Sequence, residues 1–139
     1  MLTGEPFVAA RSESDYWSYS RFLGSTCFCA TTEGELIAVL IAFRDQSQIE
    51  NVYIQDILVD TAFRKQGVTR MLLENLVKAA VELGCSRIWL TSETGNDATN
   101  VWLKLGFQNL PADYQQDHIH VHRNFKGAGK DRAIFEVSF

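Results

Sequence analysis

The spacing of apolar and polar residues predicts a series of strands in the first half of the chain. Apolar runs that suit strands occupy residues 26–32, 35–44 and 51–59. Glu33-Gly34, between the first two runs, is a hairpin turn signal. Because short connections favour antiparallel neighbours, we predict that these segments form an antiparallel meander.

A helix is predicted after Gly67, where the apolar spacing changes from about 2 residues to about 3.6. The helix should end at Gly84 and pack its apolar stripe on the sheet. The stripe consists of Val68, Met71, Leu72, Leu76, Ala79, Ala80 and Leu83. Residues 86–92 predict a buried strand, so strand, helix and strand follow in the order of a right-handed parallel unit. The expected fold class is α/β (α+β), with a mixed, mostly antiparallel central sheet and flanking helices.

Two shorter elements are predicted before the meander. Residues 7–10 form an apolar run that suits a first strand. Ser12 and Asp15 have the spacing of a helix N-cap and its acidic partner, and the helical spacing continues until Gly24. We expect the aromatic side chains of this helix to be mostly core. They are Tyr16, Trp17, Tyr19 and Phe22.

The last third of the chain predicts one helix and two strands. Asn96 is a suitable N-cap for the helix, which should end at Gly106. The face expected to be buried carries Ala98, Val101, Trp102 and Leu105. Strands are expected over residues 117–125 and 132–139, with a turn over residues 126–130 between them.

Histidines occupy alternate positions in the strand predicted over residues 117–125. Side chains two residues apart point to the same face of a strand, so His118, His120 and His122 would share a face. A metal ion bound there would need a further ligand from a neighbouring strand. We therefore favour an exposed or acceptor-facing strand face and predict no metal site.

Length and composition indicate one globular domain over residues 1–139. Such a chain buries enough surface for a single core, and 46% hydrophobic with 22% charged residues argues against disorder. The longest apolar run, residues 36–43, is far too short to span a bilayer, and the N-terminus lacks a basic region followed by an apolar one. We expect a soluble, cytoplasmic protein without a membrane partner. A net charge of −4 without a long basic stripe also disfavours nucleic acid as a partner.

The cysteines suit a reducing compartment better than a disulfide framework. The chain has three, Cys27, Cys29 and Cys85. Cys27 and Cys29 alternate in a predicted strand and should act as small buried hydrophobic side chains. A zinc site would need further ligands that this spacing does not supply.

The candidate chemistry lies where the third strand passes through a loop into the long helix. A helix N-terminus presents unpaired backbone N–H groups and the positive end of a dipole, and Gly67 would let a ligand approach the backbone closely. Arg64, Lys65 and Arg70 add positive charge around the same point of an acidic chain. This combination predicts an anion site, most simply for a phosphate group.

The same residues carry a family resemblance. Residues 64–69 (RKQGVT) resemble the pyrophosphate-binding signature of the GNAT N-acetyltransferase superfamily, (Q/R)-x-x-G-x-(G/A). The preceding residues 53–59 resemble that family's central strand. Residues 98–107 (ATNVWLKLGF) resemble its second signature, A-x-x-x-Y-x-x-x-G-F, with Trp102 where tyrosine is usual. The resemblance covers residues 51–107.

The resemblance implies a GNAT-like fold with a splayed parallel strand pair and acetyl-CoA as co-substrate. Backbone groups of residues 57–59 would pair with the pantetheine arm and the thioester carbonyl, in the manner of an added strand. Backbone N–H groups of residues 66–70 would hold the pyrophosphate. The predicted cofactor contacts are Ile57, Leu58, Val59, Arg64, Lys65, Gln66, Gly67, Val68, Thr69, Arg70 and Asn96.

Simpler interpretations exist for some of these residues. Gly67 can be a glycine that only starts the helix, and Arg64 and Lys65 can be solvated loop charges. Thr69 departs from the family, which usually has glycine or alanine there because the backbone comes close to the phosphates. Its side chain adds bulk, although its hydroxyl can donate a hydrogen bond to a phosphate oxygen.

The resemblance also names catalytic candidates. The family often uses a glutamate of the central strand as base and a tyrosine of the second signature as acid, and this sequence has Tyr53 and Trp102 at those positions. An indole N–H can donate a hydrogen bond but cannot supply a proton at physiological pH. Asp56 would act as base, as a contact for a cationic acceptor, or as a structural hydrogen-bond acceptor. Other proton donors for the leaving thiolate are water, Tyr16, Tyr19, Tyr114 and the tail histidines.

We therefore expect an acetyl-CoA-dependent N-acetyltransferase acting on a primary amine of a small molecule or peptide. The alternative is an acyl-CoA-binding module with impaired catalysis, which Tyr53, Thr69 and Trp102 favour. A phosphate-binding domain unrelated to CoA is a third interpretation. In the family the region of the first predicted helix commonly lines the acceptor pocket, so its aromatic residues are also candidate substrate contacts. Dimers are common in the family, and a homodimer is included in the expectation.

Overall fold

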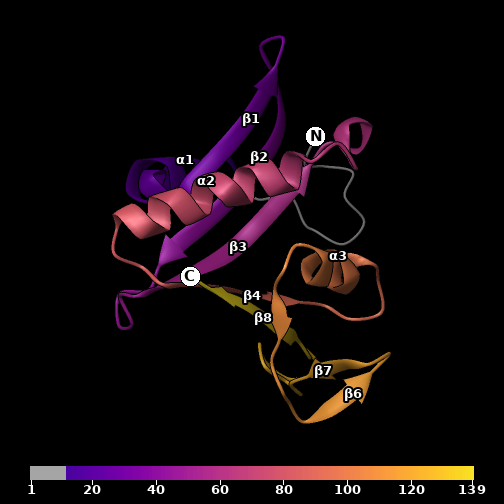
Figure 1. Cartoon of the computed structure of the whole chain (residues 1–139). Coiled ribbons are helices and arrows are strands. Elements are labelled where there is room, and N and C mark those ends of the chain that lie inside the picture. Colours follow the sequence, from indigo (N-terminus) through magenta and orange to yellow (C-terminus); the bar gives the residue numbers. More distant parts are fainter. Residues whose placement is uncertain (1–11) are drawn as a thin grey trace. The chain divides into compact units, whose positions relative to one another are not determined.

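The computed structural model describes residues 12–139, which divide into two compact units. The first unit ends at Cys85, and the second runs from Ser86 to Phe139. Figure 1 traces the elements of both units in the order of the sequence. The strand expected over residues 7–10 lies outside the described residues.

The first unit is built on an antiparallel meander. Its strands are β1 (Cys27–Thr32), β2 (Glu35–Arg44) and β3 (Asn51–Val59), with β2 paired to both neighbours. Glu33 and Gly34 connect β1 to β2 with φ angles of 50° and 79°, as a two-residue hairpin turn with the twist of a sheet requires. The predicted meander and its turn are confirmed.

Helix α2 (Val68–Glu82) lies across the strands of the meander (Figure 1). Its buried residues are Leu72, Leu73, Leu76 and Ala80. The helix was predicted with nearly these bounds, but the predicted stripe was wrong at one position. Met71 is 47% exposed, whereas Leu73, which the predicted stripe left out, is buried. The buried face of the helix therefore includes Leu73 and leaves Met71 at the surface.

Helix α1 (Glu13–Phe22) begins with the predicted cap. The Ser12 hydroxyl accepts from the Asp15 N–H, and the Asp15 carboxylate accepts in return from the Ser12 N–H. The expectation of an aromatic core is wrong for Trp17 and Phe22, which are 60% and 73% exposed. These two rings contact each other edge to face, with centroids 6.0 Å apart. The cap and the helical spacing predicted the helix but not which of its sides is covered.

Within the second unit, three strands of the six-stranded sheet pair in antiparallel order. Strand β8 (Ala133–Ser138) lies between β4 (Arg87–Ser92) and the short β5 (Gln108–Asn109). Ile88 and Phe135 are fully buried in this unit. Together with the first unit, these elements confirm a mixed α/β fold with mostly antiparallel strands and flanking helices.

Helix α3 (Ala98–Lys104) connects β4 to β5 along the chain. Its buried residues are Thr99 and Trp102, whereas Val101, predicted to share the buried face, is exposed. Positions three residues apart lie on one side of a helix, so burial of Thr99 and Trp102 turns Val101 outward. The prediction was right for Trp102 and missed Thr99.

The strand predicted over residues 117–125 is wrong. This part of the chain forms a hairpin of β6 (Tyr114–Gln116) and β7 (Ile119–Val121). Asp117 and His118 make the turn, with φ angles of 52° and 68°. His118 therefore lies in a turn, and the three histidines do not share one strand face. The apolar and polar alternation continues through the turn, so it concealed the change of direction.

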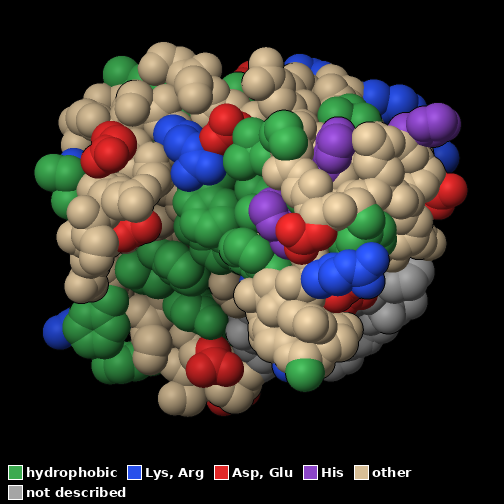
Figure 2. Space-filling model, turned by 90° about the horizontal axis from the view of Figure 1, so that it is seen from below, with side chains coloured by type: hydrophobic (Ala, Val, Ile, Leu, Met, Phe, Trp, Pro, Cys, Tyr) green, Lys and Arg blue, Asp and Glu red, His purple; other side chains and the backbone are tan. Residues whose placement is uncertain are grey.

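The surface and the cysteines add few constraints. No helix within residues 12–139 is long and apolar enough to cross a membrane, and no cluster of side chains in the same range could hold a metal ion. On the face drawn in Figure 2, basic and acidic side chains are interspersed.

The cysteines differ in burial. Cys85 is buried, but Cys27 is half-buried and Cys29 is exposed, so the prediction overestimated the burial of Cys27 and Cys29. Burial raises the pKa of the Cys27 thiol.

Candidate functional site

The loop that leads into α2 begins with a short capped turn. After β3, the 3-10 helix η2 (Thr61–Phe63) is capped by Asp60, whose carboxylate accepts from the Ala62 N–H at 3.0 Å. The Gln66 side-chain amide donates to the Ala62 carbonyl at 3.2 Å. These contacts fold the loop back on itself, so its remaining residues reach the start of α2 in a defined conformation.

Gly67 is the N-cap of α2 and has a left-handed backbone with φ 79°. A Cβ added there would meet no atom within 4 Å, so the backbone conformation, and not crowding, is what favours glycine. No side chain caps the helix, and the first helical hydrogen bond runs from the Met71 N–H to the Gly67 carbonyl at 3.1 Å. The N–H groups of residues 68–70 thus lack an intrahelical acceptor and are open to an anion.

The cationic side chains of the loop differ in their surroundings. The Arg64 Nε donates to the carbonyl of Val59 at 3.2 Å, which ties the guanidinium to the end of β3. Lys65 has a φ angle of 61°, and both Lys65 and Arg70 are exposed. Thr69 is half-buried at the second position of the helix. The predicted phosphate contacts therefore lie in one continuous segment, with cations near an unpaired helix start.

Strand β3 places two catalytic candidates on one face. Asp56 pairs with Ile41 and Tyr53 with Phe43, and the register shifts between them so that Gln55 opposes no residue of β2. Directly paired residues share a face of a sheet, and Ile41 and Phe43 are two residues apart. The bulge at Gln55 therefore brings Tyr53 and Asp56 to the same face, whereas a regular strand would separate them.

The rest of the predicted cofactor strand pairs with β2. Residues 57–59 pair with residues 38–40 of β2 in an unbroken register. Neighbouring backbone groups of an extended strand point alternately to its two sides. Some N–H and C=O groups of residues 57–59 therefore pair with β2, and the others point away from β2.

Trp102 and Asn96 belong to the second unit. Trp102 is 8% exposed, and its ring contacts Phe107 edge to face with centroids 5.2 Å apart. Packing therefore accounts for the tryptophan. The Asn96 side-chain oxygen accepts from the Ala98 N–H at 2.9 Å, and the N-cap position itself is held by Asp97. Asn96 thus caps α3 from one residue further out than predicted.

Tyr114, one of the candidate proton donors, is committed to another contact. Its hydroxyl donates a hydrogen bond to the Asp131 carboxylate, and the Arg123 guanidinium lies 4.5 Å from its ring centroid. The hydrogen bond to Asp131 raises the pKa of Tyr114 and lowers the pKa of Asp131. A phenol with a raised pKa is a weaker acid, so Tyr114 is a poor source of a proton for a thiolate.

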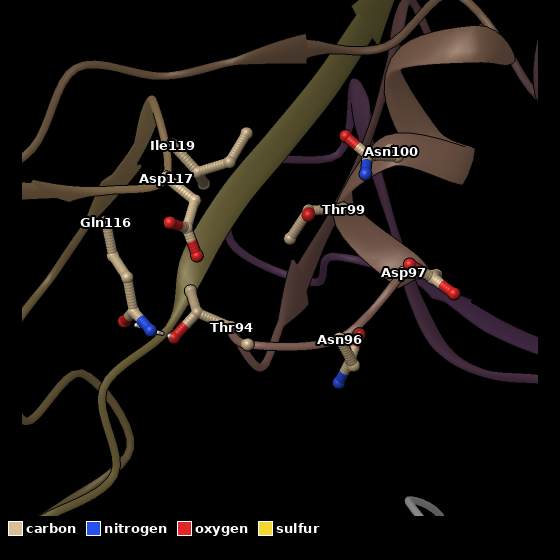
Figure 3. Close-up of a pocket in the computed structure, with 9 residues that line it drawn as sticks. Thr94, Asn96, Asp97, Thr99, Asn100, Gln116, Asp117 and Ile119 are labelled. Carbon is tan, nitrogen blue, oxygen red and sulfur yellow. Dashed lines mark hydrogen bonds between the residues drawn. The ribbon is translucent and has the colours of Figure 1, made fainter.

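Sequence reasoning missed a polar pocket in the second unit. Its volume is about 340 Å³, and its walls are residues 94–100 and the turn of the β6–β7 hairpin (Figure 3). The polar run after β4 was the available signal for one wall. The other wall could not be found because the hairpin itself was taken for a single strand.

Comparisons with known proteins identify the family and the fold. The family model for the Acetyltransferase (GNAT) family matches residues 2–107. N-alpha-acetyltransferase 30 of Dictyostelium discoideum is 31% identical over 86 residues, which are 60% of this chain and 46% of that protein. The chain thus matches less than half the length of this curated relative.

Two solved structures share the fold. The diaminobutyrate acetyltransferase EctA from Paenibacillus lautus, in complex with L-2,4-diaminobutyric acid and coenzyme A, has a TM-score of 0.74 at 19% identity, with 99% of this chain and 84% of that chain covered. Arabidopsis thaliana Naa50, in complex with the bisubstrate analogue CoA-Ac-MVNAL, has a TM-score of 0.71 at 19% identity, with 99% and 86% covered. With the family match over most of its length, the chain belongs to the GNAT acetyltransferase family.

Proposed function

We propose that the chain is an acetyl-CoA-dependent N-acetyltransferase that transfers the acetyl group directly to a primary amine of a small molecule or peptide. The observation that carries the proposal is the loop at residues 64–67, which ends in a left-handed glycine at the unpaired start of α2. An amine acceptor is supported by an N-alpha-acetyltransferase among the relatives and by a diamino acid bound to a structural neighbour.

The diphosphate of CoA would bind at the start of α2. The N–H groups of residues 68–70 would donate to its oxygens, and the helix dipole would favour its negative charge. The Thr69 hydroxyl would donate a further hydrogen bond, so we expect binding to survive the departure from glycine or alanine. Lys65 and Arg70, both exposed, would supply the compensating positive charge.

The pantetheine arm would extend from this point along β3. Amide groups of the arm would pair with the peptide groups of residues 57–59 that point away from β2. Such pairing would fix the direction of the arm and hold the thioester carbonyl near the end of the strand. The electrophile would then be oriented by backbone groups.

Transfer requires a neutral amine, a polarised thioester and a proton for the departing thiolate. The amine nitrogen attacks the thioester carbonyl carbon, the carbon–sulfur bond breaks, and the proton lost by the amine ends on the CoA sulfur. Asp56 would accept that proton directly or through water, or would bind a cationic acceptor. Tyr53 shares its face of the sheet. Trp102 would contribute packing and no proton, so water would protonate the thiolate.

The alternative function is an acyl-CoA-binding module with impaired catalysis. It is favoured by the burial of Trp102 and by the hydrogen bond that occupies the Tyr114 hydroxyl. The two functions differ in turnover and agree in cofactor binding. Positioning of the reactants alone can supply much of the acceleration, which is why we place the enzyme first.

The test is release of free CoA from acetyl-CoA across a panel of primary amines, together with acetyl-CoA affinity. We expect saturable cofactor binding and thiol release that depends on at least one amine. Binding without turnover for every amine would favour the module. Without binding, both interpretations fail and the unrelated phosphate-binding domain remains.

Other expectations remain predictions alongside this function. They are a single GNAT-like domain over residues 1–139, a cytoplasmic location and a homodimer. The acidic balance, with a net charge of −4, favours a cationic acceptor over nucleic acid.

A further inference from the structure

A compact loop with an excess of basic side chains joins β7 to β8. This β7–β8 loop, residues 122–132, has four basic residues, Arg123, Lys126, Lys130 and Arg132. Asp131 is its one acidic residue, so its formal charge is +3 in a chain whose formal charge is −4. The loop lies beyond residues 2–107, which the family model matches. The proposed acetyl transfer gives this concentration of positive charge no role.

Hydrogen bonds hold the β7–β8 loop in a defined conformation. At its base, His122 and Arg132 exchange two N–H to carbonyl hydrogen bonds, of 2.8 and 3.0 Å. Near its tip, the Lys126 N–H donates to the Lys130 carbonyl at 3.2 Å, so the two lysines lie opposite each other. Further hydrogen bonds join residue 124 to residues 127 and 129. A partner would meet an ordered surface, which lowers the conformational entropy lost on binding.

The acidic residue of the loop is occupied by contacts within the protein. The Asp131 carboxylate accepts from the Asn124 N–H at 2.8 Å through one oxygen and from the Tyr114 hydroxyl through the other. The Arg123 guanidinium lies 4.5 Å from the centroid of the Tyr114 ring, which holds this cation beside the loop. The negative charge of Asp131 is therefore used to shape the loop.

The basic side chains are mostly turned toward solvent. Arg132 pairs with Glu93 at 3.3 Å, so its charge is matched within the second unit. The other three, Arg123, Lys126 and Lys130, are exposed. The surface that the loop presents is therefore cationic.

An exposed aromatic ring lies between these cations along the chain. Phe125 is 42% exposed, and its ring contacts the His122 ring with centroids 5.6 Å apart. Protein interfaces commonly surround an apolar contact with a polar rim. Phe125 with its basic neighbours suits a partner that combines acidic side chains with an apolar one.

We propose that the β7–β8 loop docks a short acidic segment of another protein, with an apolar side chain of that segment on Phe125. Carboxylates of the segment would accept hydrogen bonds from Arg123, Lys126 and Lys130. A nucleic acid fits less well, because its closely spaced phosphates would extend over the rest of the chain. That remainder carries −7 once the +3 of the loop is set apart from the total of −4. The proposal goes beyond acetyl transfer and does not depend on it.

The test is a titration of the ¹⁵N-labelled full chain with a short peptide, followed by its backbone amide signals. The peptide has glutamate and aspartate on both sides of a central leucine, and its N-terminus is acetylated, so it offers no amine for acetyl transfer. The same peptide with glutamine and asparagine is the neutral comparison, and an oligouridylate of equal net charge is the nucleic-acid arm. We expect saturable shifts at residues 122–132 with the acidic peptide, none with the neutral peptide, and weaker binding of the oligouridylate.

Variants of Lys130 separate the loop from general charge effects. Lys130→Gln should weaken binding of the acidic peptide about two- to fivefold, the scale of one exposed ion pair. Lys130→Glu should weaken it at least about tenfold, because repulsion replaces attraction. Lys78→Glu, which makes the same charge change at an exposed position of α2, should leave binding unchanged. Equal losses in Lys130→Glu and Lys78→Glu would overturn the proposal.

A variant of Phe125 tests the apolar contact. The unchanged chain should bind the peptide with leucine more tightly than the same peptide with serine at the centre, and Phe125→Ala should bind both alike. The ratio of the two affinities does not respond to a general loss of folded protein. No saturable shift with the acidic peptide, equal binding of the neutral peptide, or tighter binding of the oligouridylate would overturn the proposal. A preference for leucine that persists in Phe125→Ala would overturn the contact with Phe125.

Discussion

At the scale of single residues, Gly67 has a backbone conformation that suits the proposed phosphate site. Its φ of 79° disfavours side chains, yet the space around its missing Cβ is open. Crowding inside the protein therefore does not explain the glycine. A positive φ at a helix start, with room beside it, is what close approach of a diphosphate to the backbone requires.

Replacement of Gly67 by valine should weaken acetyl-CoA binding at least about tenfold, because the loss of one hydrogen bond to a charged group costs about 1.5–3 kcal/mol. The strained φ should also lower the free energy of unfolding by about 1–2 kcal/mol. Calorimetric titration and denaturant unfolding measure the two effects.

Gly84→Val is the matched control. Gly84 has a φ of 81° beyond the other end of α2 and the same open surroundings. We expect a similar loss of stability with unchanged acetyl-CoA affinity. Equal losses of affinity in the two variants would mean that binding reports only on folding, and the phosphates would then lie elsewhere.

Tyr114 and Asp131 make a second prediction at this scale. The hydrogen bond lowers the pKa of Asp131, so its contribution to stability is present above the unfolded value, near 3.9, and is lost as pH falls through the folded pKa. Tyr114→Phe removes the hydrogen bond, and the pKa of Asp131 should rise toward its ordinary value. Unfolding free energy measured between pH 7 and about pH 2 should then fall less steeply for the variant. Parallel curves would show that the contact is absent in solution.

At the scale of elements, the bulge in β3 determines which catalytic candidates can act together. One extra residue at Gln55 moves Asp56 to the face of Tyr53. The sequence predicted the bounds of β3 but could not show the bulge, because Gln55 carries no glycine or proline signal. Strict alternation along the strand would place Tyr53 and Asp56 on opposite faces. Their shared face therefore follows from the structure and not from the sequence pattern.

Asp56→Asn should lower amine-dependent CoA release by about a hundredfold or more if Asp56 is the general base. If it only binds a cationic acceptor, KM for the amine should rise while kcat stays. Acetyl-CoA affinity should be unchanged in both cases. Asp60→Asn is the control, since asparagine keeps the oxygen that caps η2. Unchanged kinetics in Asp56→Asn would assign Asp56 to the structure alone.

The elements also show where sequence reasoning succeeds and fails. The bounds of β2 and β3 were predicted because their apolar runs end at strong turn signals. The β6–β7 hairpin was missed because Asp117 and His118 occupy a turn that usually takes asparagine and glycine. The same error hid Asp117 as a wall of the pocket. Thr99 was missed because a threonine between apolar positions gives no sign of its burial.

At the scale of the whole molecule, the positively charged loop stands out against an acidic chain. The net charge is −4, whereas residues 64–70 contain three basic side chains and no acidic one. The family match ends at Phe107, so the β6–β7 hairpin lies beyond it. The chemistry proposed for the loop thus lies within the matched residues.

Cofactor binding at the start of α2 is tested most directly by the amide spectrum of the ¹⁵N-labelled chain with and without acetyl-CoA. We predict the largest shifts at Gly67, Val68, Thr69 and Arg70, where unpaired N–H groups would bind the diphosphate. A cofactor concentration of about 100 times its dissociation constant should also raise the free energy of unfolding by about 2.7 kcal/mol. Saturable binding that leaves these four amides unshifted would mean that the diphosphate does not bind at the start of α2.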